Sequence, residues 1–271
     1  MRPLNIVVCI KQVPDARYWD RLALDPKTKL LNRAGIPITI GPMDKNALEE
    51  ALRIREARGG KITVVSMGPP NTKEILMSAF ALGADDAVLL SDRAFGGADT
   101  LATAYVLASG IKKLGGADLV LLGSESLDGS TGQVGPQVAE FLGMPSVTRV
   151  SKIEFKDDDT LQVRSNIEMG YMNIEVPVPA VLAVSGDINV VRLPTVFGAL
   201  WATEKTATVW GCEDLSADSN ACGLAGSPTW VPAVTTIEMK RRGEVLKGDP
   251  KEVARQLIQK LRADGVLPEI Q

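Results

Sequence analysis

The sequence predicts an α/β protein with a doubly wound, mostly parallel sheet, an added antiparallel hairpin and a long C-terminal arm. Two patterns predict this class. Short, continuous apolar runs recur through the first half of the chain, as in parallel strands that are covered on both faces. Between these runs, apolar residues repeat at helical spacing, as in the crossover helices that connect parallel strands.

Each run and each helical segment can be placed in order. The strands are expected at residues 6–10, 62–65, 87–90 and 119–122. The helices are expected at residues 44–58, 72–82, 99–113 and 133–142. Asp44, Thr72 and Asp99 suit N-caps, because their side-chain oxygens can accept the free N–H groups of a first turn. Gly83 and Gly115 suit the left-handed position that follows a helix.

The pattern changes after Pro145. Residues 150–155 and 161–165 flank an acidic turn and predict an antiparallel hairpin. Residues 180–184 predict a further strand, and residues 252–262 predict a final helix that docks on the sheet or on a partner. The expected organisation is a main α/β domain, an extended arm of weak periodicity and a C-terminal segment, over residues 1–184, 185–235 and 236–271.

Composition excludes several classes of function. The 271 residues include no histidine, which excludes serine–histidine and cysteine–histidine catalysis and any zinc site that requires imidazole. Cys9, Cys212 and Cys222 have no CxxC spacing, so a disulfide framework or an iron–sulfur cluster is not expected, and Cys9 is interpreted as a small core residue. The net charge of -3 supplies no basic field for nucleic acid. With no apolar run near the roughly 20 residues of a membrane span and no signal peptide, a cytoplasmic protein is expected.

Residues 123–137, called the first glycine loop below, are the densest stretch of glycine and small polar residues. They follow the fourth expected strand and continue into a helix, at the edge of the sheet where such folds bind nucleotides. Glycines allow close backbone approach and a helix N-terminus is electropositive, so the loop suits a pyrophosphate, with Ser130 and Thr131 as further donors. A surface loop in which these residues only turn and cap is the equal alternative.

Residues 95–100, called the second glycine loop, follow the third expected strand at the same edge. Its Asp99 is interpreted as an N-cap rather than a catalytic group. Lys11 follows the first strand and is either a partner of phosphate or of an acidic residue, or a solvated side chain. No pair of carboxylates has a spacing that argues for acid–base chemistry.

Several stretches, taken in order, resemble the beta subunit of electron-transfer flavoproteins over nearly the whole chain. They are residues 7–15, 44–52, 82–85, 128–136, 193–194 and 226–229. The resemblance implies an adenine-nucleotide-binding sheet in a heterodimer with a flavin-bearing alpha subunit. It also implies a nucleotide site made by Cys9, Gly41, Pro42, Met43, Asp44, Met67, Ser126, Leu127, Asp128, Gly129, Ser130, Thr131, Gly132, Gln133, Val134, Gly135, Pro136 and Gln137. Lys11, at the end of the first strand, is added to this candidate site from its own position.

The family divides by what this site holds. Housekeeping members hold AMP, whereas electron-bifurcating members hold a second FAD that accepts hydride from NADH and sends electrons to the alpha-subunit FAD and to ferredoxin. Both glycine loops resemble the bifurcating type, which implies FAD and NAD(H) here, with AMP as the alternative. The second loop, Phe95, Gly96, Gly97, Ala98, Asp99 and Thr100, then supplies a small wall that leaves room for the flavin and nicotinamide rings, with Thr100 as a flavin hydrogen-bond partner.

An ATP-dependent adenylating enzyme on a similar sheet is a rival from another class. Its glycine-rich serine loop would follow the first strand, where residues 11–14 read Lys-Gln-Val-Pro instead.

The expected partner surface departs from the housekeeping pattern. There, a lysine-rich stretch follows the leucine–proline pair, but here residues 195–201 are apolar and aromatic. Leu193, Phe197 and Trp201 are therefore expected to bind a flavin-dependent dehydrogenase, of acyl-CoA or lactate type, by apolar contact. Equally open is that Phe197 and Trp201 pack on this subunit's own arm.

Overall fold

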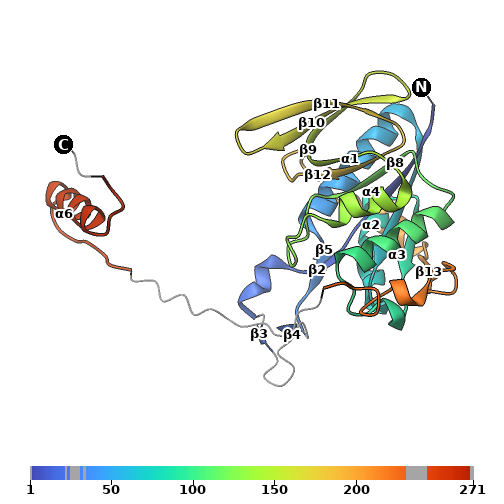
Figure 1. Ribbon diagram of the computed structural model, residues 1–271, viewed down its shortest axis with the longest axis horizontal. Coiled ribbons are helices and arrows are strands. Elements are labelled where there is room, and N and C mark those ends of the chain that lie inside the picture. The colour runs from blue at the N-terminus through green and yellow to red at the C-terminus, as the bar shows by residue number, and fades with distance from the viewer. Residues whose placement is uncertain (1, 22, 25–30, 33–34, 230–242, 269–271) are drawn as a thin grey trace. The chain divides into compact units, whose positions relative to one another are not determined.

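The computed structural model describes residues 2–21, 23–24, 31–32, 35–229 and 243–268 (Figure 1). The chain divides into two compact units, Met1–Ala233 and Val234–Gln271, and each is described by itself. The first unit is built on a nine-stranded sheet in the order β11-β10-β9-β12-β8-β1-β6-β7-β13. Its strands are β1 Leu4–Cys9, β6 Gly60–Met67, β7 Asp86–Leu90, β8 Leu119–Gly123, β9 Ser146–Phe155, β10 Thr160–Ile167, β11 Gly170–Pro177, β12 Ala180–Val184 and β13 Thr208–Trp210.

The strands from β9 across to β13 run parallel, whereas β10 is antiparallel to both β9 and β11. This arrangement confirms the predicted doubly wound, mostly parallel sheet with an antiparallel hairpin. Two short antiparallel pairs lie apart from it, and they consist of β2 Gln12–Pro14 with β5 Ile38–Ile40 and of β3 Ala23–Leu24 with β4 Leu31–Asn32. Short 3-10 helices cover Ala16–Arg21, Pro70–Thr72, Arg93–Phe95 and Ser219–Ala221.

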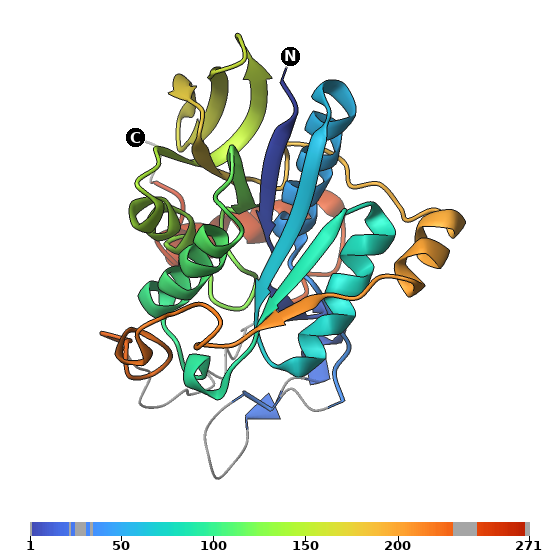
Figure 2. The ribbon, with the colours of Figure 1, turned by 90° about the vertical axis from the view of Figure 1, so that its right-hand side faces the viewer.

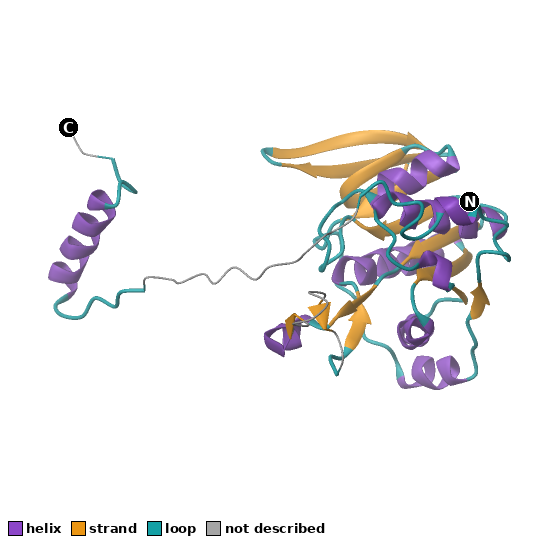
Figure 3. Cartoon of the chain, turned by 60° about the horizontal axis from the view of Figure 1, so that its bottom comes forward, coloured by secondary structure: helices purple, strands orange, loops and turns teal. Residues whose placement is uncertain are grey.

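Crossover helices cover both faces of the sheet (Figures 2 and 3). The helices are α1 Pro42–Arg58, α2 Lys73–Leu82, α3 Thr100–Lys113, α4 Val134–Leu142 and α5 Val196–Thr203. One buried apolar cluster joins α1 and α2 to the sheet, and a second joins α3 and α4 to the other face. The helices predicted from apolar periodicity therefore form on the two sides that a doubly wound sheet requires.

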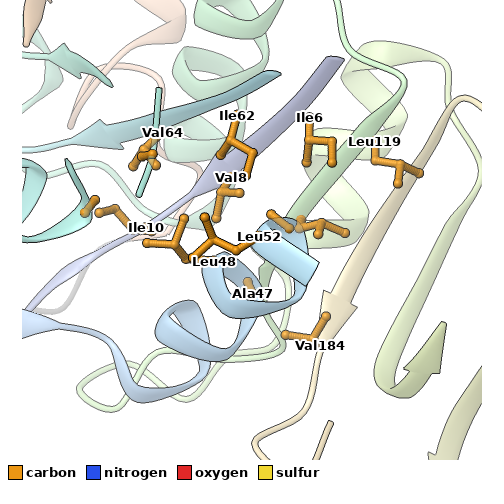
Figure 4. Close-up of a cluster of buried hydrophobic side chains, with 14 of the residues drawn as sticks. Ile6, Val8, Ile10, Ala47, Leu48, Leu52, Ile62, Val64, Leu119 and Val184 are labelled. Atoms are coloured by element: carbon orange, nitrogen blue, oxygen red, sulfur yellow. The ribbon is translucent and has the colours of Figure 1, made fainter. Parts of the chain in front are cut away.

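Strand β1 shows why the apolar runs are continuous. Ile6 and Val8 pack under α1, as Figure 4 shows, whereas Val7 belongs to the cluster on the opposite face. Because successive side chains of a strand point to opposite faces, a strand that is covered on both sides needs an apolar residue at every position. Burying each such side chain stabilises the fold by roughly 1.5–3 kcal/mol.

Strand β1 is also the point where the winding of the sheet reverses. From β1 the chain moves to β6 and β7 on one side, and then crosses to β8 on the other side. The carboxyl ends of β1 and β8 therefore flank a topological switch point, the place where open α/β sheets form their ligand crevice.

The structure corrects the secondary-structure predictions in three places. Strand β11, which pairs with β10, was not expected. The segment expected to be an irregular arm contains α5, which packs on α2 through an edge-to-face contact of Trp201 with Phe80, at 6.2 Å between ring centroids. It also contains β13, which joins the main sheet beside β7.

Two of the predicted helix starts are also corrected. Helix α1 begins at Pro42 after Gly41, so Asp44 lies inside its first turn and is not the N-cap. Thr72 precedes α2, but among the described contacts its side chain makes no capping hydrogen bond. Asp99 is confirmed as the N-cap of α3, because its carboxylate accepts the N–H groups of Leu101 and Ala102.

The second unit contains helix α6, Pro250–Ala263, which confirms the predicted C-terminal helix. Asp249 caps its N-terminus by accepting the N–H of Lys251.

Gly83 and Gly115 in the first unit have positive φ, as predicted for residues that follow a helix.

Candidate functional site

The predicted site residues converge at the carboxyl edge of the sheet, at the switch point between β1 and β8. Cys9 ends β1, Met67 ends β6 and Gly123 ends β8. The parallel registers place these ends at one edge, because Cys9 lies opposite Val65 and Met67 lies opposite Leu90. The loops that follow these strands are joined by hydrogen bonds between segments far apart in the sequence.

Asp44 makes the central contact of this edge. Its Oδ2 accepts the backbone N–H of Lys11 at 2.8 Å, and its Oδ1 accepts the backbone N–H of Gly123 at 2.9 Å. Burial raises the pKa of Asp44 to about 6, against the two backbone donors, which favour the ionised form. The carboxylate therefore ties the ends of β1 and β8 together from the first turn of α1.

The glycines on either side of Asp44 are required by this contact. A Cβ on Gly123 would lie 2.7 Å from Asp44 Oδ1, and a Cβ on Gly41 would lie 2.7 Å from Asp44 Oδ2. Both distances are shorter than van der Waals contact. Any side chain at either position would displace the carboxylate.

Lys11 is the cation of the site. Its Nζ lies 2.6 Å from Asp128 Oδ1 and 3.3 Å from Ser126 Oγ, both in the first glycine loop. Of the alternatives open for Lys11, the structure therefore supports a partner of an acidic residue. The ammonium also lies near Gly129, since a Cβ added there would be 4.0 Å from Nζ. The positive charge is therefore close to the glycine backbone of the loop.

The backbone of the first glycine loop is shaped by left-handed residues. Ser130 has φ 47° and Gly132 has φ 64°. The N–H of Ser130 donates to Ser126 O at 2.8 Å, which closes a turn ahead of α4. Alternation of left-handed and ordinary residues turns successive amides to one side, which is the geometry of an anion-binding backbone.

The N-termini of α3 and α4, both at this edge, differ in their capping. Helix α3 is capped by Asp99, so the first amides of α3 already have an acceptor. Within the described part of the chain, the Gln133 side chain at the start of α4 makes no capping hydrogen bond. The start of α4, where Val134 and Gly135 carry N–H groups and Pro136 has none, is therefore better suited to an anionic group than the start of α3.

The two glycine loops are held side by side. Thr100 Oγ1 donates to Gln133 Oε1 at 2.9 Å, which joins the starts of α3 and α4. Gly96 and Gly97 are exposed, but Phe95 is buried in the cluster under α3. The exposed part of the second glycine loop therefore consists of glycine backbone, whereas the Phe95 ring is buried in the core.

A later segment of the chain covers this second loop. The N–H of Leu224 donates to Gly96 O at 3.0 Å, and a Cβ on Gly97 would lie 3.3 Å from Leu224 Cβ. Thr229 donates its N–H and its hydroxyl to Asp99 Oδ2 at 3.1 and 2.8 Å. Burial opposes ionisation of Asp99, but the hydrogen bonds from Ala102 and Thr229 outweigh it and lower its pKa.

Sequence reasoning missed this cover, although residues 226–229 carried part of the family resemblance. The motif contained Ser227 and Thr229, whose hydroxyls bind the N-cap residue of α3. No spacing rule indicates which of two helix starts a distant hydroxyl will bind.

The remaining predicted residues fall into two groups. Cys9 is 5% exposed and its pKa is raised to about 12, first by burial and then by Asp44, so it is a core thiol and not a nucleophile. Gly135 is also buried, and its missing side chain lets α4 approach Leu122 and Ala183 in the sheet. Residues at the mouth of the site remain partly or fully exposed, and they are Pro42, Met43, Met67, Leu127, Thr131, Val134, Pro136 and Gln137.

The three residues of the predicted partner surface differ in exposure. Leu193 and Phe197 are 86% and 83% exposed, so the Phe197 ring is not buried against the described part of this subunit. Trp201 does pack on it, against Phe80, and Lys205 Nζ lies 4.3 Å from its ring centroid. Exposed apolar residues therefore line the outer side of α5, while its inner side is fixed to α2.

The segment that leads to this surface is anchored on α1. Asn46 and Asn189 exchange hydrogen bonds, and Arg192 donates to the buried Glu49 at 2.8 Å. These polar contacts explain why α1 buries Asn46, Glu49 and Glu50.

No helix in the described part of the chain is long and apolar enough to cross a membrane.

Comparison with known proteins agrees with this geometry. A family model described as "Electron transfer flavoprotein domain" matches residues 28–209. The chain is 47% identical over 261 residues to "Electron transfer flavoprotein subunit beta" of Clostridium acetobutylicum, covering 96% of this chain and 99% of the relative. It is 43% identical over 266 residues to "Caffeyl-CoA reductase-Etf complex subunit CarD" of Acetobacterium woodii, covering 97% of this chain and 100% of the relative.

A third relative is "Acryloyl-CoA reductase electron transfer subunit gamma" of Anaerotignum propionicum. The two chains are 38% identical over 271 residues, which cover 97% of this chain and 100% of the relative. Both the matched model and the near-complete coverage agree with the sheet, the switch point and the glycine loops described above. The chain therefore belongs to the electron transfer flavoprotein family, among its beta subunits.

Proposed function

We propose that this chain pairs with a flavin-bearing alpha subunit and holds FAD at the carboxyl edge of its own sheet. In this proposal NADH reduces that FAD, and the electrons are divided between the alpha-subunit FAD, which serves a dehydrogenase, and ferredoxin. The bound flavin supplies the redox chemistry, and the protein supplies position and electrostatics.

The observation that carries the nucleotide part is the start of α4, which lacks a side-chain cap, together with Lys11 beside the first glycine loop. The N–H groups of Val134 and Gly135 and the turned backbone of the first glycine loop suit the oxygens of a pyrophosphate. Lys11 adds a positive charge that is within reach of both Ser126 and Asp128. The residues present therefore fit the diphosphate of a dinucleotide, or the single phosphate of AMP.

Each group at this edge has a definite role in the proposal. Asp44 fixes the ends of β1 and β8, and Asp128 pairs with the Lys11 ammonium before phosphate binds. Thr100 and Gln133 hold the starts of α3 and α4 together, which sets the width between the two glycine loops. Leu224 lies against Gly97 and limits access to it.

The choice of FAD over AMP rests on the second glycine loop. AMP needs only the first loop and the neighbouring strand ends, whereas the flavin and nicotinamide rings need an open wall beyond them. Gly96 and Gly97 are exposed and carry no side chain, which supports a flat ring lying against them. The alternative, an AMP-holding structural subunit, leaves this open wall without a function.

The partner dehydrogenase is proposed to act on an acyl-CoA. Two relatives carry the names of acryloyl-CoA reductase and caffeyl-CoA reductase assemblies, which favours this class over a lactate-type enzyme. The exposed side of α5, with Leu193 and Phe197, is the proposed docking surface. An apolar surface of this kind suits a buried anchor contact rather than electrostatic steering.

The test is the cofactor content of the protein purified with its alpha subunit, measured by acid release and chromatography. Two FAD and no AMP per heterodimer are expected, together with NADH-dependent reduction of ferredoxin. One FAD and one AMP would leave the nucleotide site in place and reject the direct reaction with NADH. Absence of any nucleotide beyond the alpha-subunit FAD would reject the site itself.

A further inference from the structure

We propose that Asp99 is a positioning residue whose carboxylate clasps residues 223–229, called the cover segment below, over the second glycine loop. In this proposal the cover segment opens and closes, and in its closed position it holds the flavin ring against Gly96 and Gly97. The clasp itself follows from the contacts of Asp99, whereas the identity of the covered ring rests on the function proposed above.

Asp99 uses its two carboxylate oxygens for two different partners. Its Oδ1 accepts the N–H groups of Leu101 and Ala102 at 3.0 and 3.1 Å and caps α3. Its Oδ2 accepts the N–H and the hydroxyl of Thr229 at 3.1 and 2.8 Å, and its own backbone N–H donates to Ser227 Oγ at 2.8 Å. One side chain therefore fixes the start of a helix with one oxygen and the end of the cover segment with the other.

The base and the remainder of the cover segment are held by different forces. Cys222, the residue before it, is 1% exposed in the buried cluster under α3, and a Cβ on Gly223 would lie 2.1 Å from Ala94 O. Residues 224–229 are all partly or fully exposed. Segments with few buried apolar contacts and exposed hydrogen bonds open locally at a low cost in free energy. The cover segment therefore has a fixed base and a part that can open, and the bonds to Asp99 oppose the opening.

The closed cover segment lies directly on the exposed backbone of the second glycine loop. The N–H of Leu224 donates to Gly96 O at 3.0 Å, and a Cβ on Gly97 would lie 3.3 Å from Leu224 Cβ. The Leu224 side chain is itself 63% exposed. Glycine backbone beside an exposed leucine offers an apolar surface to a flat ring, and opening of the cover segment would remove the leucine from it.

The clasp also lies beside the proposed phosphate site. Thr100, the residue after Asp99, donates its hydroxyl to Gln133 Oε1 at 2.9 Å, at the start of α4. Two consecutive residues therefore join the cover segment, the start of α3 and the start of α4. A dinucleotide that extends from the first to the second glycine loop meets the cover segment at its ring end.

The experiment compares hydrogen exchange in the full-length protein, purified with its alpha subunit, with that in Asp99→Asn. Asparagine keeps a side-chain oxygen for the cap of α3 but replaces Oδ2 by an NH2 group, which cannot accept the Thr229 N–H. Peptides that cover residues 223–229 should exchange on the order of tenfold faster in the variant, whereas peptides from the first turn of α3 should not change. Thr229→Val, which removes only the hydroxyl, should give a smaller increase in the same peptides.

The effect on the covered ring is measured as the rate at which FAD leaves the heterodimer after dilution. Asp99→Asn should release one of the two FAD molecules several-fold faster than the wild type and the alpha-subunit FAD at an unchanged rate. Asp249→Asn is the matched control, because Asp249 is the N-cap of α6 and the same substitution there should change neither the exchange of the cover segment nor the release of FAD.

Each possible result decides the proposal or the function on which it rests. Unchanged exchange of residues 223–229 in both Asp99→Asn and Thr229→Val would overturn the clasp, as would an equal increase at the start of α3, which would leave Asp99 only as a helix cap. Faster exchange with unchanged release of FAD would overturn the role of the cover segment in holding the ring. One FAD and one AMP in the wild-type heterodimer would instead reject the FAD function, and the exchange rates would still decide the clasp.

Discussion

The Asp44 carboxylate accepts the backbone N–H of Gly123 at 2.9 Å, across 79 residues of sequence. The same carboxylate accepts the N–H of Lys11, so one side chain of α1 holds the ends of the two strands that flank the switch point. Glycine is required at positions 41 and 123 because any Cβ there would meet the carboxylate. The relative position of the carboxyl ends of β1 and β8 therefore depends on a buried acid.

The first prediction concerns the pH dependence of stability. The pKa of Asp44 is raised from 3.8 to about 6 in the folded protein, so the folded state binds its proton more tightly than the unfolded state does. The resulting stabilisation is fully present below pH 3.8, falls as the pH rises through 6, and amounts to roughly 3 kcal/mol at most. In Asp44→Asn this part of the pH dependence should disappear.

The measurement is urea denaturation of both proteins between pH 4 and pH 7.5. The unfolding free energy of the wild type should fall relative to that of the variant as the pH rises. A difference that stays constant over this range would mean that Asp44 does not titrate there. Other groups titrate equally in both proteins, so the comparison isolates Asp44.

The second prediction concerns the first glycine loop. Gly132 has φ 64°, and Val at this position would strain the backbone and disturb the amides ahead of α4. Gly132→Val should lower the nucleotide content of the purified heterodimer several-fold. Gly143→Val is the matched control, because Gly143 has φ 67° at the far end of α4 and an added Cβ would meet no described atom within 4 Å.

Both substitutions should cost similar stability, on the order of 1–2 kcal/mol or more, since both place a side chain in the left-handed region. Only Gly132→Val should lose nucleotide. Equal nucleotide content in the two variants would reject the assignment of phosphate to this loop.

The central sheet could be predicted because its strands are covered on both faces. β1, β6, β7, β8 and β12 are runs of buried apolar residues, which no other local structure of that length explains as well. β11 was missed because it is an edge strand with mostly exposed residues, so it has no apolar pattern. β13 was missed because it spans only three residues, and its pairing with β7 is a tertiary contact.

A candidate site could be proposed from the sequence, but the contacts of each of its residues could not. Asp44 stands near the start of a helix and was assigned as its N-cap. The preceding Gly41-Pro42 pair was the overlooked signal, since proline favours the first helical position and places Asp44 within the first turn. The contact of Asp44 with Gly123 depends on how β1 and β8 pair, which no local pattern encodes.

The third prediction concerns the anchor of the segment before Leu193. Glu49 is 4% exposed and binds Arg192 and Arg53; burial opposes its ionisation, but the hydrogen bonds from Arg192 and Arg53 outweigh this and lower its pKa. Arg192→Ala should therefore lower the unfolding free energy by about 1.5–3 kcal/mol, because it leaves a buried carboxylate with fewer donors. Lys156→Ala, which breaks the exposed pair with Glu175, should leave the unfolding free energy nearly unchanged, because water and salt screen an exposed ion pair. Equal losses in chemical denaturation would contradict the assigned role of Arg192.

The fourth prediction separates docking from packing on α5. Phe197 is 83% exposed, so Phe197→Ala should leave thermal stability unchanged. If Phe197 is an anchor for the dehydrogenase, the same variant should weaken the complex by about 2 kcal/mol, or roughly 30-fold in Kd, in a binding titration. Trp201→Ala should lower stability, since the contact with Phe80 contributes about 0.5–1.5 kcal/mol beyond the buried area. Met169→Ala is the control for loss of an exposed apolar side chain, because Met169 is 95% exposed in the turn between β10 and β11. Unchanged affinity in Phe197→Ala, or an equal loss in Met169→Ala, would remove Phe197 from the docking surface.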